Sequence, residues 1–154
     1  MPRDPETTSR MMSAVKSKDS KAELLLRAEL WSQGYRYRKN WGKVFGHPDL
    51  AFPAAKIAVF VDGDFWHGNA WRLRGLSSLA ELFPTRTEWW VEKISRNIAR
   101  DGRVTERLTE EGWLVLRYWE SRVLSEPRAV AEEVGFHVSE RRRLSAPGSR
   151  SHQA

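Results

Sequence analysis

Three aspartates and a histidine flank one apolar segment of this sequence. Asp49 precedes the run Lys56–Val61, Asp62 and Asp64 follow it, and His67 comes shortly afterwards. The run is rich in β-branched residues and has the length of a buried central strand. Carboxylates at adjacent strand ends can hold Mg²⁺, which can polarise a phosphate and activate a water. Histidine is suited to proton transfer near neutral pH, so the pattern predicts metal-assisted phosphodiester hydrolysis.

A short link, Pro53–Ala55, separates this run from the extended segment that contains Asp49. Such a link predicts an antiparallel hairpin that places Asp49 opposite a residue near positions 58–60, with Asp62 slightly beyond. Asp62 and Gly63 could instead be ordinary turn residues. The aromatic pair Phe65–Trp66 directly after the strand favours a functional site, because exposed aromatics there have little structural use.

Composition predicts one soluble, monomeric domain. The chain has 154 residues and no cysteine. It shows no apolar run of the roughly 20 residues that a membrane span needs and no secretory signal, so we expect a cytoplasmic, nucleoid-associated protein. Without cysteine there is no disulfide and no thiolate site, so any metal must be held by oxygen or imidazole ligands.

Charge and aromatic content bear on the partner. The formal net charge is +6, but residues 141–154 carry four arginines and no acid, which leaves +2 for residues 1–140. We expect a disordered polar arm over 1–8 and a disordered basic tail over 141–154, and neither argues strongly for nucleic acid. Several of the eight tryptophans lie beside basic residues, a pattern typical of proteins that stack on bases and contact phosphates.

Periodicity places these residues on an α/β domain over 9–140. A first helix begins near Ser9. Ser20 and Glu23 have capping-box spacing for a second helix, which should end near Gly34 and bury Leu24, Leu25, Ala28 and Trp31. Extended segments follow at 35–37 and 44–52, and the strand at 56–61 comes next. After an irregular stretch at 63–84, we expect a helix from 85 or 87 to 111 with a break at Gly102. A strand at 113–119 and a helix at 125–140 complete the domain. This order predicts a mixed central β-sheet flanked by α-helices.

The motifs together resemble the very short patch repair (Vsr) endonucleases. The resemblance rests on Gly46–Asp49, the strand ending Phe60–Gly63, Phe65–Gly68, Thr85–Trp90, Lys93, Asn97, Asp101, Gly112–Trp113 and Trp119–Glu120, in that order. It covers most of the chain and implies a restriction-endonuclease-like core.

The resemblance implies a reaction and a site. The expected reaction is Mg²⁺-dependent hydrolysis of one DNA strand on the 5′ side of the thymine in a T:G mismatch, with Mn²⁺ as a substitute ion. Asp49 would bridge the metal, the backbone carbonyl of Val61 would complete its site, and Asp62 would lie beside it. His67 would handle the proton of the attacking water or stabilise the phosphate. Glu23 would act through metal-bound water, although the capping box already explains it.

The resemblance also implies DNA contacts. Phe65, Trp66 and Trp90 would wedge into the base stack beside the mismatch, although Trp90 could instead belong to the core with Ile94. The other expected DNA-binding residues are Met12 and Val15 of the first helix, in the opposite groove, and Arg86, Lys93 and Asn97. Lys93, Asn97 and Asp101 share one helical face, which could be a solvated stripe or could support the catalytic loop.

The zinc ligands of familiar Vsr proteins are missing. Their positions correspond to Asp64, Asn69, Trp71 and Ser121, so no structural zinc is expected. We hypothesise that Trp71 packs into the space while Asp64 and Asn69 hydrogen-bond the loop; alternatively, Asp64 adds a carboxylate to the Mg²⁺ site. Comparison with familiar relatives also implies a longer loop at 72–83, which would change the DNA recognised.

Three functions follow as alternatives. The first is T:G mismatch nicking in very short patch repair, with mismatched double-stranded DNA as partner and a mismatch-repair protein that loads the enzyme. The second is a restriction or defence nuclease of the same fold that needs no mismatch. The third is a non-catalytic DNA-binding module, which the combination of Asp49, Asp62 and His67 disfavours.

Overall fold

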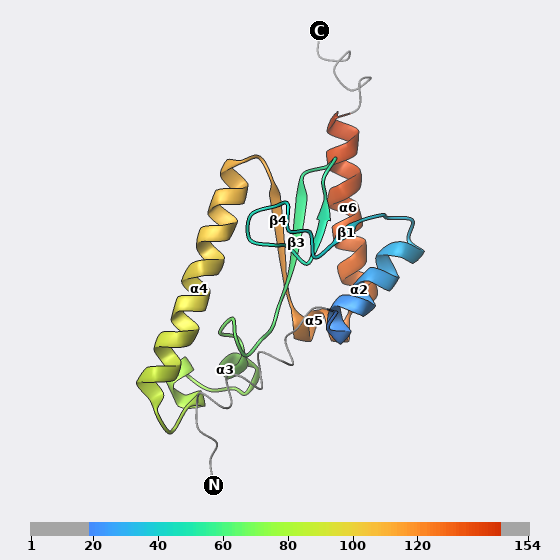
Figure 1. Ribbon diagram of the computed structural model, residues 1–154. Helices are drawn as coiled ribbons and strands as arrows, with labels where there is room; N and C mark the ends of the chain where they lie inside the picture. Colours follow the sequence, from blue (N-terminus) through green and yellow to red (C-terminus); the bar gives the residue numbers. More distant parts are fainter. Residues whose placement is uncertain (1–18, 146–154) are drawn as a thin grey trace.

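A computed structural model describes residues 19–145 (Figure 1). The expected N-terminal arm and first helix, with Met12 and Val15, lie outside the described residues. The elements are α2 Lys21–Ser32, β1 Arg38–Lys39, β2 Leu50–Phe52, β3 Ile57–Asp62, α3 Ala70–Leu73, the 3-10 helix η1 Leu79–Leu82, α4 Thr87–Glu110, β4 Leu114–Trp119, α5 Glu120–Ser125 and α6 Pro127–Ser145. Within 19–145, no helix is both long enough and apolar enough to span a bilayer.

The four strands form one mixed sheet in the order β1-β2-β3-β4. β1, β2 and β3 are antiparallel neighbours, and β3 runs parallel to β4. Leu50 pairs with Val59, which confirms the predicted hairpin. The strand begins at Ile57 and not at Lys56, because Lys56 has a positive φ of 54° and belongs to the turn. The predicted α/β fold with a mixed, helix-flanked sheet is therefore confirmed.

Both faces of the sheet are covered by helices, with α4 on one side and α2, α5 and α6 on the other (Figure 1). Alternate residues of β3 point to opposite faces, as a strand requires. Ile57 and Val59 pack in the core formed with α2 and α6, whereas Ala58 and Phe60 pack with Leu108 of α4. A strand buried on both faces explains the nearly continuous apolar run in the sequence.

Helix α2 begins as predicted but buries a different face. Ser20 is its N-cap, and its side chain accepts a hydrogen bond from the Glu23 amide. Leu24 and Trp31 are 52% and 55% exposed, so the predicted core stripe was wrong. The face that packs in the core carries Ala22, Leu26 and Leu30, together with Glu23 and Arg27. The buried ion pair between Glu23 and Arg27 made this face look polar in the sequence.

Other boundaries also differ. Helix α4 continues through Gly102 without the predicted break, and α6 extends past position 140, so 141–145 are helical. Only 50–52 of the extended segment 44–52 is a strand, because Gly46 and His47 both have positive φ and turn the chain. The irregular stretch 63–84 contains the short helices α3 and η1, and α5 was not predicted.

Candidate active site

Asp49 is held against the end of β3. It lies just before β2, and its Oδ2 atom accepts a hydrogen bond of 2.7 Å from the Val61 amide. The side chain lines a pocket of about 270 Å³ together with Asp62 and His67. The hairpin and the loop after β3 therefore bring together three of the four residues on which the sequence analysis opened.

Glu23 of helix α2 is a second acidic residue beside Asp49. Burial, together with the negative charge of Glu23 and a hydrogen bond with its carboxyl group, raises the pKa of Asp49 to about 8, against the lowering effect of the Val61 amide. A neighbouring carboxyl group at a buried position favours the protonated form of Asp49 when no cation lies between them. The same Glu23 carboxylate accepts from the Asp19 amide at 3.0 Å and from Arg27 at 3.1 Å, so Glu23 holds the start of α2 as well as lying at the site.

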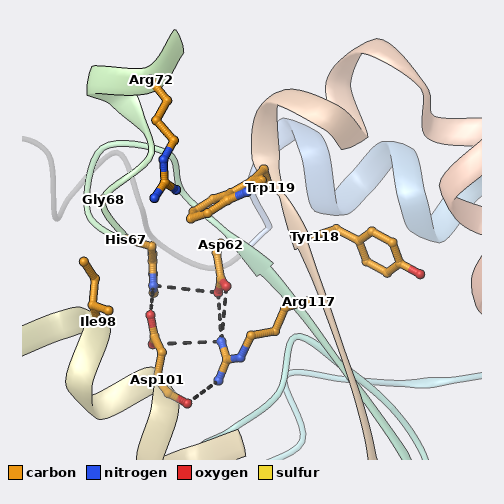
Figure 2. A pocket seen from close by; sticks show the side chains of 9 residues that line it. All are labelled: Asp62, His67, Gly68, Arg72, Ile98, Asp101, Arg117, Tyr118 and Trp119. Atoms are coloured by element: carbon orange, nitrogen blue, oxygen red, sulfur yellow. Dashed lines mark hydrogen bonds and ion pairs between the residues drawn. The ribbon is translucent and has the colours of Figure 1, made fainter. Parts of the chain in front are cut away.

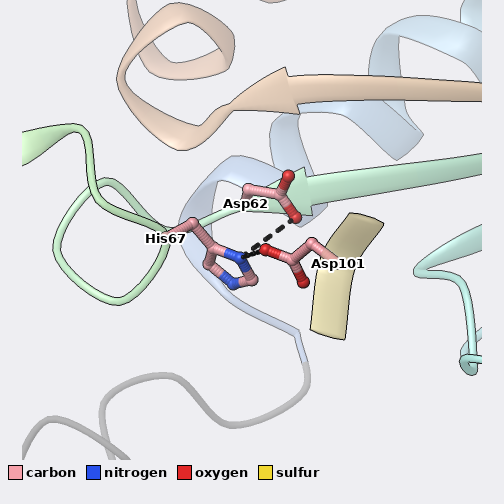
Figure 3. A group of neighbouring side chains, drawn as sticks. All are labelled: Asp62, His67 and Asp101. Carbon is pink, nitrogen blue, oxygen red and sulfur yellow. Dashed lines mark hydrogen bonds and ion pairs between the residues drawn. The ribbon is translucent and has the colours of Figure 1, made fainter. Parts of the chain in front are cut away.

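His67 is oriented by a carboxylate of helix α4. Its Nδ1 atom hydrogen-bonds Asp101 and lies 3.8 Å from Oδ1 of Asp62 (Figure 3). Because a carboxylate only accepts hydrogen bonds, Nδ1 is the donor in this bond, and the bond fixes the orientation of the ring. The sequence placed Asp101 on a helical face that could support the catalytic loop, but it did not identify Asp101 as the partner of His67.

Arg117 of β4 joins these groups and was missed by the sequence analysis. Its Nη1 donates to both carboxylate oxygens of Asp62, at 3.1 and 3.2 Å, and its Nη2 donates to the backbone carbonyl of Asp101 at 3.1 Å (Figure 2). Nε donates to Thr105, and the guanidinium lies 4.2 Å from the ring centroid of Phe60. One signal was present, because an arginine inside an apolar strand needs a buried partner.

A divalent metal could be held at two places in this site: by Asp62, His67 and Asp101, or by Asp49 beside Glu23. Donor atoms of Asp62, His67 and Asp101 all lie within 4.8 Å of one another. The guanidinium of Arg117 already neutralises Asp62, so a cation there would have to compete with it. Asp49, by contrast, pairs with no cationic side chain in the part of the chain that the structure describes. The Asp49 position is thus the better candidate for the metal.

The helical face that carries Lys93, Asn97 and Asp101 supports the loop after β3. Asn97 donates to the Trp66 carbonyl at 3.1 Å, and the Lys93 ammonium lies 5.5 Å from the centroid of the Trp66 ring. With Asp101 on His67, all three side chains contact the Phe65–Gly68 segment. This arrangement excludes the interpretation of the face as a solvated stripe.

The aromatic residues of the expected wedge form a cluster under this loop. Trp66 and Trp90 are each 5% exposed, and Trp90 stacks on Phe83 at a centroid distance of 4.8 Å. Trp90 shares this small core with Ile94, as one interpretation of the helix predicted. Phe65 is half-buried and packs edge-on against both tryptophans, so it is the more accessible member.

A hydrogen-bond network occupies the positions that correspond to the zinc ligands. Asp64 Oδ1 accepts from the Asn69 amide and the Ser121 hydroxyl, both at 2.8 Å, and Oδ2 accepts from the Ser121 backbone amide at 2.9 Å. The hypothesis that Asp64 and Asn69 tie the loop is confirmed. These bonds occupy the Asp64 carboxylate, which makes it unsuited to the Mg²⁺ site. Trp71 lies against Arg72, with 4.8 Å between the guanidinium carbon and the ring centroid.

Comparison with known proteins identifies the family. The family model described as DNA mismatch endonuclease Vsr matches residues 3–73, a range that includes Glu23, Asp49 and His67. The type II nicking enzyme V.NmeDIP of Neisseria meningitidis serogroup C is 47% identical over 92% of each chain. V.HpaIIP of Haemophilus parainfluenzae, also named a type II nicking enzyme, is 40% identical over 89% of this chain and 94% of its own length. The DNA mismatch endonuclease Vsr of Escherichia coli strain K12 is 36% identical over 76% of this chain and 71% of its own. The chain therefore belongs to the Vsr family and is a DNA-nicking endonuclease.

Proposed function

We propose that this enzyme nicks one strand of double-stranded DNA on the 5′ side of the thymine in a T:G mismatch, in very short patch repair, and that it requires Mg²⁺. The observation that carries the proposal is the meeting of Asp49, Glu23 and the His67–Asp101 pair at one pocket. A carboxylate site for a cation beside an oriented histidine is the equipment that phosphodiester hydrolysis needs.

The residues present fit a divalent cation. Burial and the neighbouring Glu23 raise the pKa of Asp49, so a cation would replace the proton that this carboxyl group holds, and the Val61 amide keeps Asp49 at the strand end. Asp49 and the Val61 carbonyl would hold Mg²⁺, with Glu23 reaching it through bound water. The ion would polarise the scissile phosphate and lower the pKa of the attacking water. Mn²⁺, which also accepts oxygen ligands, should substitute for it.

His67 serves as the proton acceptor in this proposal. With Nδ1 bonded to Asp101, the Nε2 lone pair takes the proton of the attacking water, or the ring stabilises the phosphate. Asp62 was expected beside the metal. Since both its oxygens accept from Arg117, we assign it to the support of the His67 group instead.

The aromatic cluster is the proposed contact beside the mismatch. Phe65 is the accessible member, and the buried Trp66 and Trp90 support it from behind. Base-aromatic stacking contributes about 1–3 kcal/mol per base. Lys93 and Asn97 lie next to this cluster and are proposed to contact the same stretch of DNA, as is the exposed Arg86 at the start of α4.

A second candidate is nicking at a short sequence or at modified DNA without a mismatch. The relatives with 47% and 40% identity carry the name type II nicking enzyme, which mentions no mismatch. The non-catalytic alternative is set aside, because the chain is an endonuclease.

One set of duplexes separates the two candidates. Oligonucleotides of the same sequence with a T:G or a T:A pair are incubated with enzyme and Mg²⁺, or with EDTA, and both strands are mapped. The proposal expects a single nick 5′ of the mispaired thymine, only with Mg²⁺. Equal nicking of both duplexes would support the second candidate, and nicking in EDTA would refute the metal requirement.

A further inference from the structure

Helix α4 carries a regular stripe of basic residues outside the proposed catalytic group. The spacing between successive members is three, four, three and four residues, which keeps them within roughly 80° of one another around an α-helix. From first to last the stripe spans about 21 Å along the helix axis. Its members are Lys93, Arg96, Arg100, Arg103 and Arg107.

The central arginines of this cationic stripe are exposed and lack acidic partners. Within residues 19–145, no carboxylate forms an ion pair with Arg96, Arg100 or Arg103, and Arg100 donates only to the neutral side chain of Asn97. The arginines of α5 and α6 behave differently, because several are paired with glutamates: Arg122 with Glu133, Arg128 with Glu132 and Arg143 with Glu140. The charges of Arg96, Arg100 and Arg103 are therefore left available to an external anion, whereas Arg107 at the end of the stripe pairs with Glu111 at 3.2 Å.

The cationic stripe borders the active site. Arg100 lines the same pocket as Asp49 and His67, and the next residue, Asp101, holds His67. At the far end of the helix, Arg107 lies 3.9 Å from the ring centroid of the exposed Phe45. A DNA strand whose reacting phosphate enters the pocket at Asp49 must therefore pass alongside this face of α4.

We propose that the cationic stripe of α4 binds the sugar-phosphate backbone of the duplex on one side of the nick, independently of base sequence. Arg100 contacts the phosphate nearest the scissile one, and Arg96 and Arg103 contact its neighbours. Guanidinium groups suit this role because their fork of donors matches phosphate oxygens and stays charged. Such contacts fix the register of the enzyme on DNA, whereas the loop beside Phe65 deals with the bases. The inference needs only a DNA substrate and holds whether or not a mismatch is required.

The salt dependence of DNA binding tests this inference. Fluorescence anisotropy in EDTA, with strand integrity checked on a gel, gives Kd for T:G and T:A duplexes at several salt concentrations. Each phosphate contact contributes about 0.9 to the slope of log K against log salt. Arg96→Ala, Arg100→Ala and Arg103→Ala should each lower that slope by about 0.9 and weaken binding roughly five- to tenfold at 0.1 M salt, equally on both duplexes.

Two controls make the outcome decisive. Arg128→Ala removes an arginine that is 81% exposed on α6 and should leave Kd and slope unchanged. The variants Arg96→Lys and Arg103→Lys keep the charge and should retain most of the slope. A triple variant combines Arg96→Ala, Arg100→Ala and Arg103→Ala. The inference is overturned if this variant keeps the wild-type slope, if Arg128→Ala weakens binding as much as the single substitutions on α4 do, or if the substitutions on α4 weaken binding to the T:G duplex alone.

Discussion

The guanidinium of Arg117 on β4 donates to both carboxylate oxygens of Asp62 on the neighbouring parallel strand β3, at 3.1 and 3.2 Å. Both side chains are largely shielded from water. The pair ties the end of β3 to α4 as well, because the same guanidinium bonds the Asp101 carbonyl and the Thr105 hydroxyl. A buried charge that loses its partner is costly, so this relationship has measurable consequences.

Replacing Arg117 with methionine should destabilise the fold by about 3 kcal/mol, since it leaves Asp62 as an uncompensated buried charge. Urea unfolding measures the loss. Asp62→Asn added to Arg117→Met removes that charge and should recover more than half of the lost stability. If the double variant were as unstable as the sum of the two single variants, the pair would not be coupled as described.

Asp101→Asn should lower the nicking rate without weakening DNA binding. The amide keeps the size of the side chain but no longer holds the proton-bearing Nδ1 of His67, and the loss of such an orienting carboxylate costs roughly 10²–10⁴ in rate. Single-turnover nicking and DNA affinity measured side by side separate the two effects. Residues that act as a unit are non-additive, so Asp101→Asn should add little in a His67→Ala background. Additive losses would contradict the assigned pairing.

Mg²⁺ affinity should rise with pH. Burial and the neighbouring Glu23 raise the pKa of Asp49 to about 8, above its ordinary value. Because the pKa of Asp49 is higher in the folded protein than in the unfolded chain, the proton on Asp49 stabilises the metal-free fold relative to the unfolded chain. This stabilisation is complete below the ordinary pKa of Asp and is lost as the pH rises through about 8. Because a cation must displace that proton, affinity should increase up to about tenfold per pH unit between pH 6 and 8.

Calorimetry of Mg²⁺ binding in buffers of different ionisation enthalpy measures the protons released. Glu23→Gln removes the charge that helps to raise the pKa of Asp49, so the rise in affinity should begin at lower pH. An affinity that is flat from pH 6 to 8 in the wild type would contradict the raised pKa of Asp49.

Asp64→Ala should destabilise the protein by about 2–4 kcal/mol, because it removes three charge-assisted hydrogen bonds: one to Asn69 within the catalytic loop and two to Ser121 at the start of α5. Ser121→Ala removes only the hydroxyl bond and should cost about 1–2 kcal/mol. Thermal unfolding of the two variants gives the comparison. Elemental analysis should find no tightly bound zinc; one zinc per chain would show that a metal still holds this loop.

The sequence predicted the parts of the site that depend on local geometry. Turn length and alternation fix the register of a hairpin, so the proximity of Asp49 to the end of β3 followed from Pro53–Ala55. The partners of His67 and Asp62 could not be found in this way. Asp101 reaches His67 through the packing of α4 on the sheet, and Arg117 reaches Asp62 from the neighbouring strand β4; no spacing along the chain encodes either contact.

The face of α2 shows a second limit. Sequence periodicity assigns the more apolar side of a helix to the core. In α2 the core side includes the ion pair of Glu23 and Arg27, because Glu23 must reach Asp49. When a helix contributes a buried acidic residue to a site, a prediction based on hydrophobicity alone therefore assigns the wrong face of that helix to the core.

The most direct test of the site is nicking of a T:G duplex by Asp49→Asn in Mg²⁺, with DNA affinity measured on the same samples. Asparagine keeps the shape of the side chain but removes the charge that would hold the cation. We predict that the single-turnover rate falls by a factor on the order of 10³ or more, while the affinity for DNA stays within about threefold of the wild type. A variant that nicks at a rate close to that of the wild type would show that the metal and the reacting phosphate bind elsewhere.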